Sequence, residues 1–448
     1  PGYAGLRALV SGADVIVDAL LGVGVTRPIG GTLKDLLEAV RQQLSLRSHG
    51  DSLTDVISQG LVPARPLVVA VDCPSGLDCD SGTLDPAALT ADVTVTFAYP
   101  KVGLLLFPGA EAVGDIVVSD IGIPPELAAD VETELATPET IREWLPSRPR
   151  SAHKGTFGRA LIVAGSVNYV GAAALAGSGA SRVGAGLVTL ALPASIHGSV
   201  AAQLAEVTYL LAPHDLGVIS EAAVEVVRQA ADDYDVLLVG PGLTQETETA
   251  AFVRSLLGLG HAERRGRIGF TTGSAATKSK RRPLPPLVVD ADGLNALAKA
   301  SEWQTVLPSD TILTPHPGEM ARLIGGHAST SDVQEDRIGV ARTYAVEWEA
   351  IVVLKGAFTV IASPAGRTMV LPFANPGLAT AGSGDVLAGA IAGLRAQGMH
   401  AFEAAAAGAY LHGLAGEIAR TDLGDRGIVA PDLAPRLPLA LKRVARGG

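Results

Sequence analysis

The chain has 448 residues, of which 48% are apolar and only 4% aromatic, and its formal net charge is −11. This length is enough for more than one domain. The acidic balance argues against a nucleic-acid partner, because such proteins usually present a basic face. No apolar run of about 18 residues is free of charges, Gly and Pro, so a transmembrane helix is not expected.

The cysteines and the first residues give an indication of the cellular compartment. Cys73 and Cys79 are too few to staple a chain of this length, and no second Cys/His pair offers zinc spacing. Reduced thiols in a cytosolic protein are the simpler interpretation. The start, Pro1-Gly-Tyr-Ala, shows no basic region followed by an apolar one, so no signal peptide is expected. We expect a cytoplasmic homo-oligomer without membrane or nucleic-acid partners.

The first 120 residues alternate apolar runs with helical patterns. Residues 14–21 predict a buried strand that leads into a loop, and residues 32–44 have helical periodicity. Residues 66–72 form an apolar run that ends on Asp72, and further strands are predicted at 91–97 and 114–120. Such continuous Val, Ile and Leu runs indicate a parallel sheet covered on both faces.

Residues 121–150 are rich in Pro and polar residues and predict a linker, so we place the domain boundary near 140, giving domains 1–140 and 141–448. The α/β pattern restarts after His153. It predicts a second three-layer α/β/α domain with a mostly parallel sheet. Its expected strands are 160–165, 187–192, 236–240, 287–290, 311–314 and 351–354, and its clearest helices are 171–182, 383–394 and 401–418.

The segment 264–282 breaks this pattern because it is basic, polar and aperiodic. A solvated loop is the favoured interpretation, and a nucleic-acid patch is the lesser one.

The strongest chemical signal is Asn375-Pro-Gly-Leu-Ala-Thr-Ala-Gly-Ser-Gly-Asp-Val-Leu-Ala-Gly389. Its glycines lead straight into a helical pattern, so backbone N–H groups and a helix N-terminus would face an anion. Asp385 falls in the first turn of that helix. It could simply cap the helix, or it could accept a proton from a hydroxyl that attacks a phosphate.

Three further motifs follow predicted strands, where open α/β sheets bind ligands. Lys355 could neutralise a nucleotide phosphate or cap a strand at the surface, and His316 lies between two prolines in a turn. Asp290 and Asp292 could bind Mg²⁺ indirectly or cap a helix, and the residues do not decide between these. Gly242 would allow close approach of the backbone to a ligand.

Together these strings resemble the ribokinase-like superfamily and, within it, the NAD(P)H-hydrate dehydratases. The similarity covers about residues 150–440, from His153-Lys-Gly-Thr-Phe-Gly158 to the loop at 375–385. The resemblance implies that ADP or ATP, with Mg²⁺, drives dehydration of NADHX and NADPHX, with ADP favoured. It implies Asp385 as the base that activates the ring hydroxyl. It further implies nucleotide contacts at Lys355, Gly356, Ala357, Phe358, Thr359 and Gly384, and hydrate contacts at Ala172, Gly242, His316 and Asp385.

The N-terminal part resembles the later portion of the NAD(P)H-hydrate epimerase domain, a Rossmann-like α/β/α fold. The resemblance implies that Asp18 and Ser75 bind potassium, which suits hard oxygen ligands, and that Asp72 contacts the hydrate. The family's Asn/Gly-rich loop does not occur before Asp18, so this domain is expected to be partial and its epimerase activity uncertain. The implied contacts to the substrate phosphates are Gly22, Val23, Gly24, Val25, Thr26, Arg27 and Pro28.

Two other functions are compatible with parts of the sequence. A hydroxymethylpyrimidine or sugar kinase of the same superfamily would leave the phosphate on its product, but the epimerase-like half argues against it. The N-terminal half could also be a non-catalytic binding or oligomerisation module.

Overall fold

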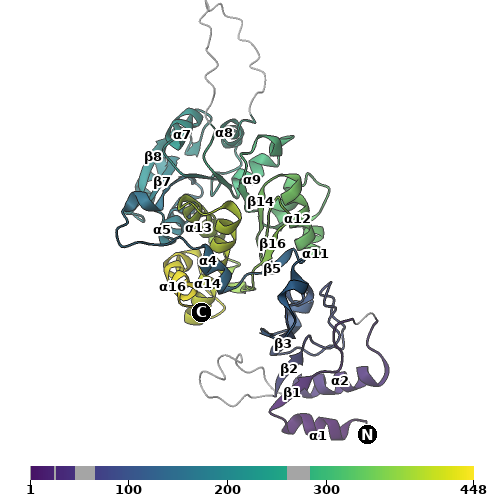
Figure 1. Ribbon diagram of the computed structural model, residues 1–448. Helices are drawn as coiled ribbons and strands as arrows, with labels where there is room; N and C mark the ends of the chain where they lie inside the picture. The colour runs from purple at the N-terminus through teal and green to yellow at the C-terminus, as the bar shows by residue number, and fades with distance from the viewer. Residues whose placement is uncertain (1, 25–26, 46–65, 260–282, 448) are drawn as a thin grey trace, which may run out of the picture. The chain divides into compact units, whose positions relative to one another are not determined.

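The computed structural model describes residues 2–24, 27–45, 66–259 and 283–447. The chain divides into two compact units, Pro1–Val131 and Glu132–Gly448 (Figure 1). The basic segment 264–282, and Val25 and Thr26 of the N-terminal loop, lie outside the described residues.

The first unit is built on a parallel sheet of four strands in the order β1-β2-β3-β4. Val68 and Ala70 of β2 are buried in a cluster with Leu37 of helix α2, so the period-two pattern of the strand meets the apolar face of the helix. The elements are α1 (Ala4–Gly12), β1 (Val15–Asp18), α2 (Gly31–Ser45), β2 (Leu67–Val71), β3 (Val93–Phe97), η1 (Val102–Leu105), η2 (Gly109–Ala112), β4 (Asp115–Ser119) and η3 (Pro125–Ala128).

The second unit holds a sheet of ten strands in the order β5-β16-β15-β14-β13-β12-β11-β6-β7-β8. All neighbouring pairs are parallel except those that β15 makes with β14 and β16. The strands are β5 (Thr133–Leu135), β6 (Arg159–Val163), β7 (Leu187–Pro193), β8 (Thr208–Ala212), β11 (Val236–Val239), β12 (Leu287–Val289), β13 (Ile312–Leu313), β14 (Ile351–Leu354), β15 (Val360–Ala362) and β16 (Thr368–Val370), with β9 (His214–Asp215) and β10 (Val218–Ile219) forming a separate pair.

Helices cover both faces of this sheet. Strand residues of one parity, such as Ile162 and Leu238, belong to a core cluster with helices α5, α13, α14 and α16. Residues of the other parity, such as Leu161 and Leu237, are also fully buried but lie outside that cluster. The helices are α4 (Pro138–Trp144), α5 (Val170–Arg182), α6 (Ala194–Ala201), α7 (Ala223–Ala231), α8 (Thr247–Leu257), α9 (Asp292–Leu297), α10 (Pro317–Leu323), α11 (Thr330–Glu335), α12 (Arg337–Glu347), α13 (Ser383–Ala396), α14 (Ala401–Leu423), α15 (Ala430–Leu433) and α16 (Leu437–Arg446), with short turns η4 (Lys154–Phe157), η5 (Trp303–Val306), η6 (Pro376–Leu378) and η7 (Ala434–Arg436).

Small residues let α5 and α13 pack backbone against backbone (Figure 1). A Cβ added to Gly389 would lie 2.0 Å from the Ala176 carbonyl oxygen, and one on Gly179 would lie 2.3 Å from the Val386 carbonyl oxygen. Both distances are shorter than any van der Waals contact, so only glycine fits at these positions. The Gly- and Ala-rich composition therefore sets the position of α13, which begins at the Gly-rich loop.

The strand order changes direction between β6 and β11, because the chain adds β7 and β8 on one side and later strands on the other. Ligands of open α/β sheets bind at such a switch point, outside the carboxyl ends of the strands. The Gly165 N–H donates to the Pro241 carbonyl across this point at 2.8 Å. The sheet thus brings the loops that follow β6 and β11 together.

The predicted α/β class with a mostly parallel sheet is confirmed. The sequence patterns did not indicate β5, β15 or β16, which are strands of three residues each. β5 precedes residue 140 in the chain, yet it pairs with β16 in the sheet of the second unit, so the unit boundary lies at Val131/Glu132.

Candidate functional site

The Gly-rich loop ends at helix α13, whose N-terminus carries Asp385. Gly382 precedes the helix with φ +88°, a left-handed conformation that favours glycine. The loop is held by its own side chains: Asn375 Oδ1 accepts the Gly377 N–H at 2.8 Å, and Ser383 Oγ donates to the Leu378 carbonyl at 2.9 Å. The N–H groups of Ser383 and Asp385 donate to the Thr380 and Gly382 carbonyls, at 3.4 and 3.1 Å, so the start of α13 is held at a fixed place against the loop.

Lys355 lies at the end of β14, where it contacts acidic residues that follow β12 and β13 and borders the Gly-rich loop. Its Nζ lies 2.7 Å from Asp290 Oδ1 and 3.6 Å from Glu319 Oε2. A Cβ placed on Gly384 would lie 3.5 Å from the same Nζ, so the ammonium group borders the Gly-rich loop. Burial works against the charge of Lys355, but Asp290 and Glu319 outweigh it and hold the lysine pKa above its usual value.

The Asp385 carboxyl has an unusual proton affinity. Burial and the nearby negative charge of Asp290 raise its pKa to about 7, although Lys355 acts in the opposite direction. A general base works best when its pKa is close to the working pH. The pKa of Asp385 thus lies in the range in which a carboxylate can act as a general base.

His316 and Glu319 cap helix α10 reciprocally. His316 Nδ1 accepts the Gly318 N–H at 3.0 Å, while Glu319 Oε2 accepts the His316 N–H at 2.8 Å. Burial lowers the pKa of His316, so the imidazole is neutral near pH 7. This capping box fixes the imidazole beside the Lys355 cluster.

Two predicted hydrate contacts meet at the switch point. Gly242 has φ +62°, and a Cβ on it would lie 2.5 Å from the Ala172 Cβ. Gly240 approaches the neighbouring strand still more closely, because a Cβ there would lie 1.8 Å from the Asp290 carbonyl oxygen. The backbone of this loop can therefore reach a ligand that lies over the ends of β6 and β11.

The predicted nucleotide segment, residues 355–359, forms a tight turn after β14. Gly356 has φ +142° and Phe358 has φ +50°, and Thr359 Oγ1 donates to the Gly356 carbonyl at 2.8 Å. Ala357 lies in the exposed middle of the turn. The turn begins at the lysine that borders the Gly-rich loop, so the segments at 355–359 and 382–385 face one region.

Arg337 and His412 support this region but carry no recognisable motif in the sequence. The buried Arg337 Nη2 donates to the carbonyls of Leu354 and Lys355, at 2.9 and 3.2 Å, and burial lowers its pKa to about 10. Burial lowers the pKa of His412 to about 4, although its hydrogen bond to the backbone of Ser383, at the start of α13, acts in the opposite direction. Each is a single polar residue in a helix, so only its burial in the folded structure identifies it as part of the site.

The acidic residues of the site do not form a ready metal cage. Within residues 2–24, 27–45, 66–259 and 283–447, no three His, Cys, Asp or Glu side chains gather as metal ligands. Asp290 Oδ1 instead accepts Thr314 Oγ1 at 2.7 Å as well as Lys355, and Asp292 Oδ2 accepts the Thr244 N–H at 2.8 Å. The described part of the chain also has no helix long and apolar enough to cross a membrane.

The first unit brings together the two predicted potassium ligands. Asp18 is buried, and its carboxylate accepts the Ser75 N–H at 2.8 Å and the Ser75 Oγ–H at 2.5 Å. Ser75 Oγ in turn accepts the Leu21 N–H at 2.9 Å. These bonds tie the end of β1 to the loop after β2.

Asp72, at the end of β2, has φ +67° and binds a lysine that the prediction had given no role. Lys101 Nζ donates to Asp72 Oδ1, to Thr96 Oγ1 at 3.0 Å and to the Phe97 carbonyl at 3.0 Å. Burial raises the pKa of Asp72, but the bonds from Lys101 and the Phe97 N–H outweigh it, so the pKa lies below its usual range. Of the predicted phosphate loop, Gly22, Val23, Gly24, Arg27 and Pro28 are described, and all five are exposed to solvent.

Comparison with known proteins gives two family matches. Residues 160–438 match the NAD(P)H-hydrate dehydratase family, and residues 4–103 match the family of the YjeF-related protein N-terminus. The chain is 40% identical over 435 residues to a bifunctional NAD(P)H-hydrate repair enzyme of Moorella thermoacetica, covering 96% of this chain and 73% of that protein. It is 31% identical to the enzyme of the same name from Escherichia coli, covering 94% and 70%.

Solved structures agree with the second unit. The ADP/ATP-dependent NAD(P)H-hydrate dehydratase of Bacillus subtilis, co-crystallised with ATP and Mg²⁺, is 31% identical with a TM-score of 0.55, covering 70% of this chain and 99% of that one. A ribokinase-like protein of Enterococcus faecalis, 23% identical with a TM-score of 0.56, covers 70% of this chain and 98% of its own and shares the fold. The chain therefore belongs to the family of bifunctional NAD(P)H-hydrate repair enzymes.

Proposed function

We propose that the second unit dehydrates NADHX and NADPHX to NADH and NADPH at the expense of ADP or ATP. The observation that carries this proposal is Asp385, a carboxyl with a pKa of about 7 at the N-terminus of α13, next to the Lys355 ammonium group. A base and an anion site at one place are the requirements for moving a phosphoryl group onto a hydroxyl.

In the proposed reaction, the terminal phosphate of the nucleotide lies against the start of α13 at Gly384 and against the Lys355 ammonium group. Asp385 takes the proton from the ring hydroxyl while that oxygen forms a bond to the terminal phosphorus, and the nucleotide leaves one phosphate shorter. The phosphate then departs from the ring carbon with its bonding electrons, a ring proton is lost, and the nicotinamide double bond is restored. The resemblance favours ADP as the natural co-substrate.

The residues present suit Mg²⁺ bound chiefly through the nucleotide. Asp290, Asp292 and Glu319 supply hard oxygen atoms around the site, but Lys355 and the threonine contacts occupy part of their capacity. A metal that keeps several waters and shares phosphate oxygens fits this donor set better than a closed protein cage. Mg²⁺ would supply neutralisation of phosphate charge.

Hydrate binding is assigned to the switch point. Gly242 packs closely against Ala172, so its backbone can approach the reduced ring. The neutral imidazole of His316 is assigned a contact to the same ring. Gly356 to Thr359 and Gly384 are assigned to the nucleotide, because both segments border Lys355.

For the first unit we propose the hydrate epimerase site, with Asp72 against the hydrate and the exposed loop at 22–28 against the substrate phosphates. Asp18 and Ser75 would supply oxygen ligands to potassium, and their mutual contact supports a shared site.

The buried free thiols Cys73 and Cys79 suit a reducing compartment, so a cytoplasmic location is part of the proposal. Homo-oligomerisation is also proposed, and light scattering of the purified chain tests it.

The test of the dehydratase is turnover of NADHX and NADPHX with ADP, with ATP and without nucleotide. The proposal expects NADH or NADPH to form only when a nucleotide is present. Dehydration at the same rate without nucleotide would overturn it. Asp385→Asn is the matched inactive variant, because it keeps the shape of the side chain and removes the base.

A further inference from the structure

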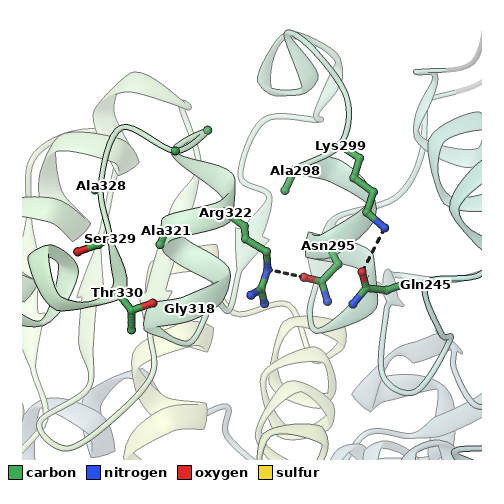
Figure 2. A pocket seen from close by; sticks show the side chains of 12 residues that line it. Gln245, Asn295, Ala298, Lys299, Gly318, Ala321, Arg322, Ala328, Ser329 and Thr330 are labelled. Atoms are coloured by element: carbon green, nitrogen blue, oxygen red, sulfur yellow. Dashed lines mark hydrogen bonds between the residues drawn. The ribbon is translucent and has the colours of Figure 1, made fainter.

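A cavity of about 580 Å³ lies between the loop after β11 and helices α9 and α10 (Figure 2). Among its lining residues are Gln245, Asn295, Lys299 and Arg322, together with the backbone of Gly318. Among the residues that the structure describes, the lining contains no aspartate or glutamate, although the chain carries a net charge of −11. The size is that of a pocket for a small organic ligand.

Two cations face this cavity, and their partners leave the charge uncompensated. Lys299 Nζ donates to Gln245 Oε1 at 3.1 Å, and Arg322 Nε donates to Asn295 Oδ1 at 2.9 Å (Figure 2). Both acceptors are neutral amides. Throughout the part of the chain that the structure describes, no carboxylate forms an ion pair with Lys299 or Arg322.

The amide partners also orient the cations. Asn295 is buried, and its Nδ2 donates to Asp292 Oδ1 at 3.3 Å, so its Oδ1 is free to hold the Arg322 guanidinium. Because Nε is the bonded atom, the two Nη groups are left to form a fork. Such a fork matches the oxygens of a phosphate.

The cavity lies next to residues of the proposed active site. Gly318 lines it, and the Gly318 N–H donates to Nδ1 of His316. Asp292, which positions Asn295, also accepts the Thr244 N–H in the loop that contains Gly242. A molecule whose reduced ring lies over Gly242 and His316 would therefore have its other end at this cavity.

We propose that this cavity binds the phosphate-bearing nucleotide end of the hydrate, with Lys299 and Arg322 contacting a phosphate. The inference rests on the proposed function, which places a dinucleotide with its reacting ring at Asp385. Two phosphate groups of that substrate have the required chemistry: the diphosphate, present in both hydrates, and the additional ribose phosphate, present only in NADPHX.

The test uses the full chain with Lys299→Gln, Arg322→Gln and the double variant. The expected result is a rise of about tenfold in the KM for hydrate per lost charge, with kcat and the KM for nucleotide within twofold of wild type. A rise for both hydrates identifies the diphosphate, and a rise for NADPHX alone identifies the ribose phosphate. Arg322→Lys should fall between wild type and Arg322→Gln, because it keeps the charge and loses the fork.

The matched control is the double variant Lys442→Gln, Arg443→Gln on α16. These two residues line a separate cavity of about 570 Å³, and their replacement removes the same amount of charge. The control should keep the wild-type KM. The proposal is overturned if the double variant at 299 and 322 keeps the wild-type KM for both hydrates, if only the KM for nucleotide changes, or if the control raises the KM equally.

A direct binding measurement separates this inference from the proposed function. NADPH carries the same phosphates as NADPHX, so its Kd for the full chain can be measured by titration calorimetry whether or not turnover occurs. A Kd that rises at least tenfold in the double variant supports the cavity as the binding site. An unchanged Kd overturns it, while absence of hydrate turnover in the wild type overturns the proposed dehydratase instead.

Discussion

Replacing Asp385 with asparagine should stabilise the free protein while it removes catalysis. The folded carboxyl has a pKa of about 7, whereas an ordinary aspartate has a value near 3.8. Between these two values the folded group holds a proton that the unfolded group has released. Stability therefore falls as the pH rises through about 4 to 7, and it stays at the lower level above 7.

The magnitude follows from the size of the shift. One pKa unit corresponds to about 1.4 kcal/mol, and the shift of roughly three units sets an upper value of about 4 kcal/mol. The carboxyl is partly exposed, and solvent screening lowers the figure, so we expect about 2 to 4 kcal/mol. Asparagine has no charge to desolvate, so Asp385→Asn recovers this free energy only where the wild-type group is ionised.

The assay is thermal unfolding of the nucleotide-free chain, wild type against Asp385→Asn, at about pH 8 and about pH 4. We expect the variant's Tm to be several degrees higher at pH 8 and equal to the wild-type value at pH 4. Asp332→Asn is the control, because Asp332 caps helix α11, is exposed and has a lowered pKa, so its replacement should not stabilise. A variant that is less stable than wild type at pH 8, or equally more stable at both pH values, would refute the reasoning.

The other predictions concern the same site. The kcat/KM for hydrate should rise with pH through an apparent pKa of about 7 as Asp385 ionises, and a flat pH profile would count against Asp385 as the base. Lys355→Met should move that apparent pKa upward and raise the KM for nucleotide about tenfold or more, because Lys355 lowers the pKa of Asp385; pH profiles of the variant check both effects. Gly242→Ala should cost about 1 to 3 kcal/mol and raise the KM for hydrate, since its Cβ would lie 2.5 Å from that of Ala172 at φ +62°; unchanged stability and KM would contradict this. Gly389→Ala should destabilise by about 2 to 4 kcal/mol, because its Cβ would lie 2.0 Å from a backbone carbonyl of α5, and denaturant unfolding measures the loss.

The architecture was largely predictable because most of its strands and helices correspond to long apolar or periodic stretches of sequence. Continuous apolar strands and Ala-rich helices predicted the central parallel sheet and the start of α13 at the Gly-rich loop. Three-residue strands such as β15 and β16 give too few residues for a periodic pattern, and their pairing depends on neighbours far along the chain. β5 is the clearest example, because its partner β16 follows more than two hundred residues later.

The candidate site was predictable where several residues act through a contiguous motif. The glycines and Asp385 form one string, and Lys355 follows a strand. Arg337 was missed because a single arginine at the start of a helix looks like a surface residue until the fold buries it against the carbonyls of β14. Lys101 lies between two predicted strands and was assigned no role, because its bond to Asp72 depends on the turn after β3, which the sequence pattern does not define. The raised pKa of Asp385 likewise comes from burial and from Asp290, which is remote in sequence.

The fate of the transferred phosphate distinguishes the proposed dehydratase from a kinase most directly. The purified chain is incubated with NADPHX, Mg²⁺ and terminally labelled ADP, and NADPH, free phosphate and phosphorylated organic products are measured together. We expect one inorganic phosphate and one NADPH for each AMP formed, with no phosphorylated hydrate accumulating. Stable phosphate on the organic product, without recovery of NADPH, would contradict it and identify a kinase.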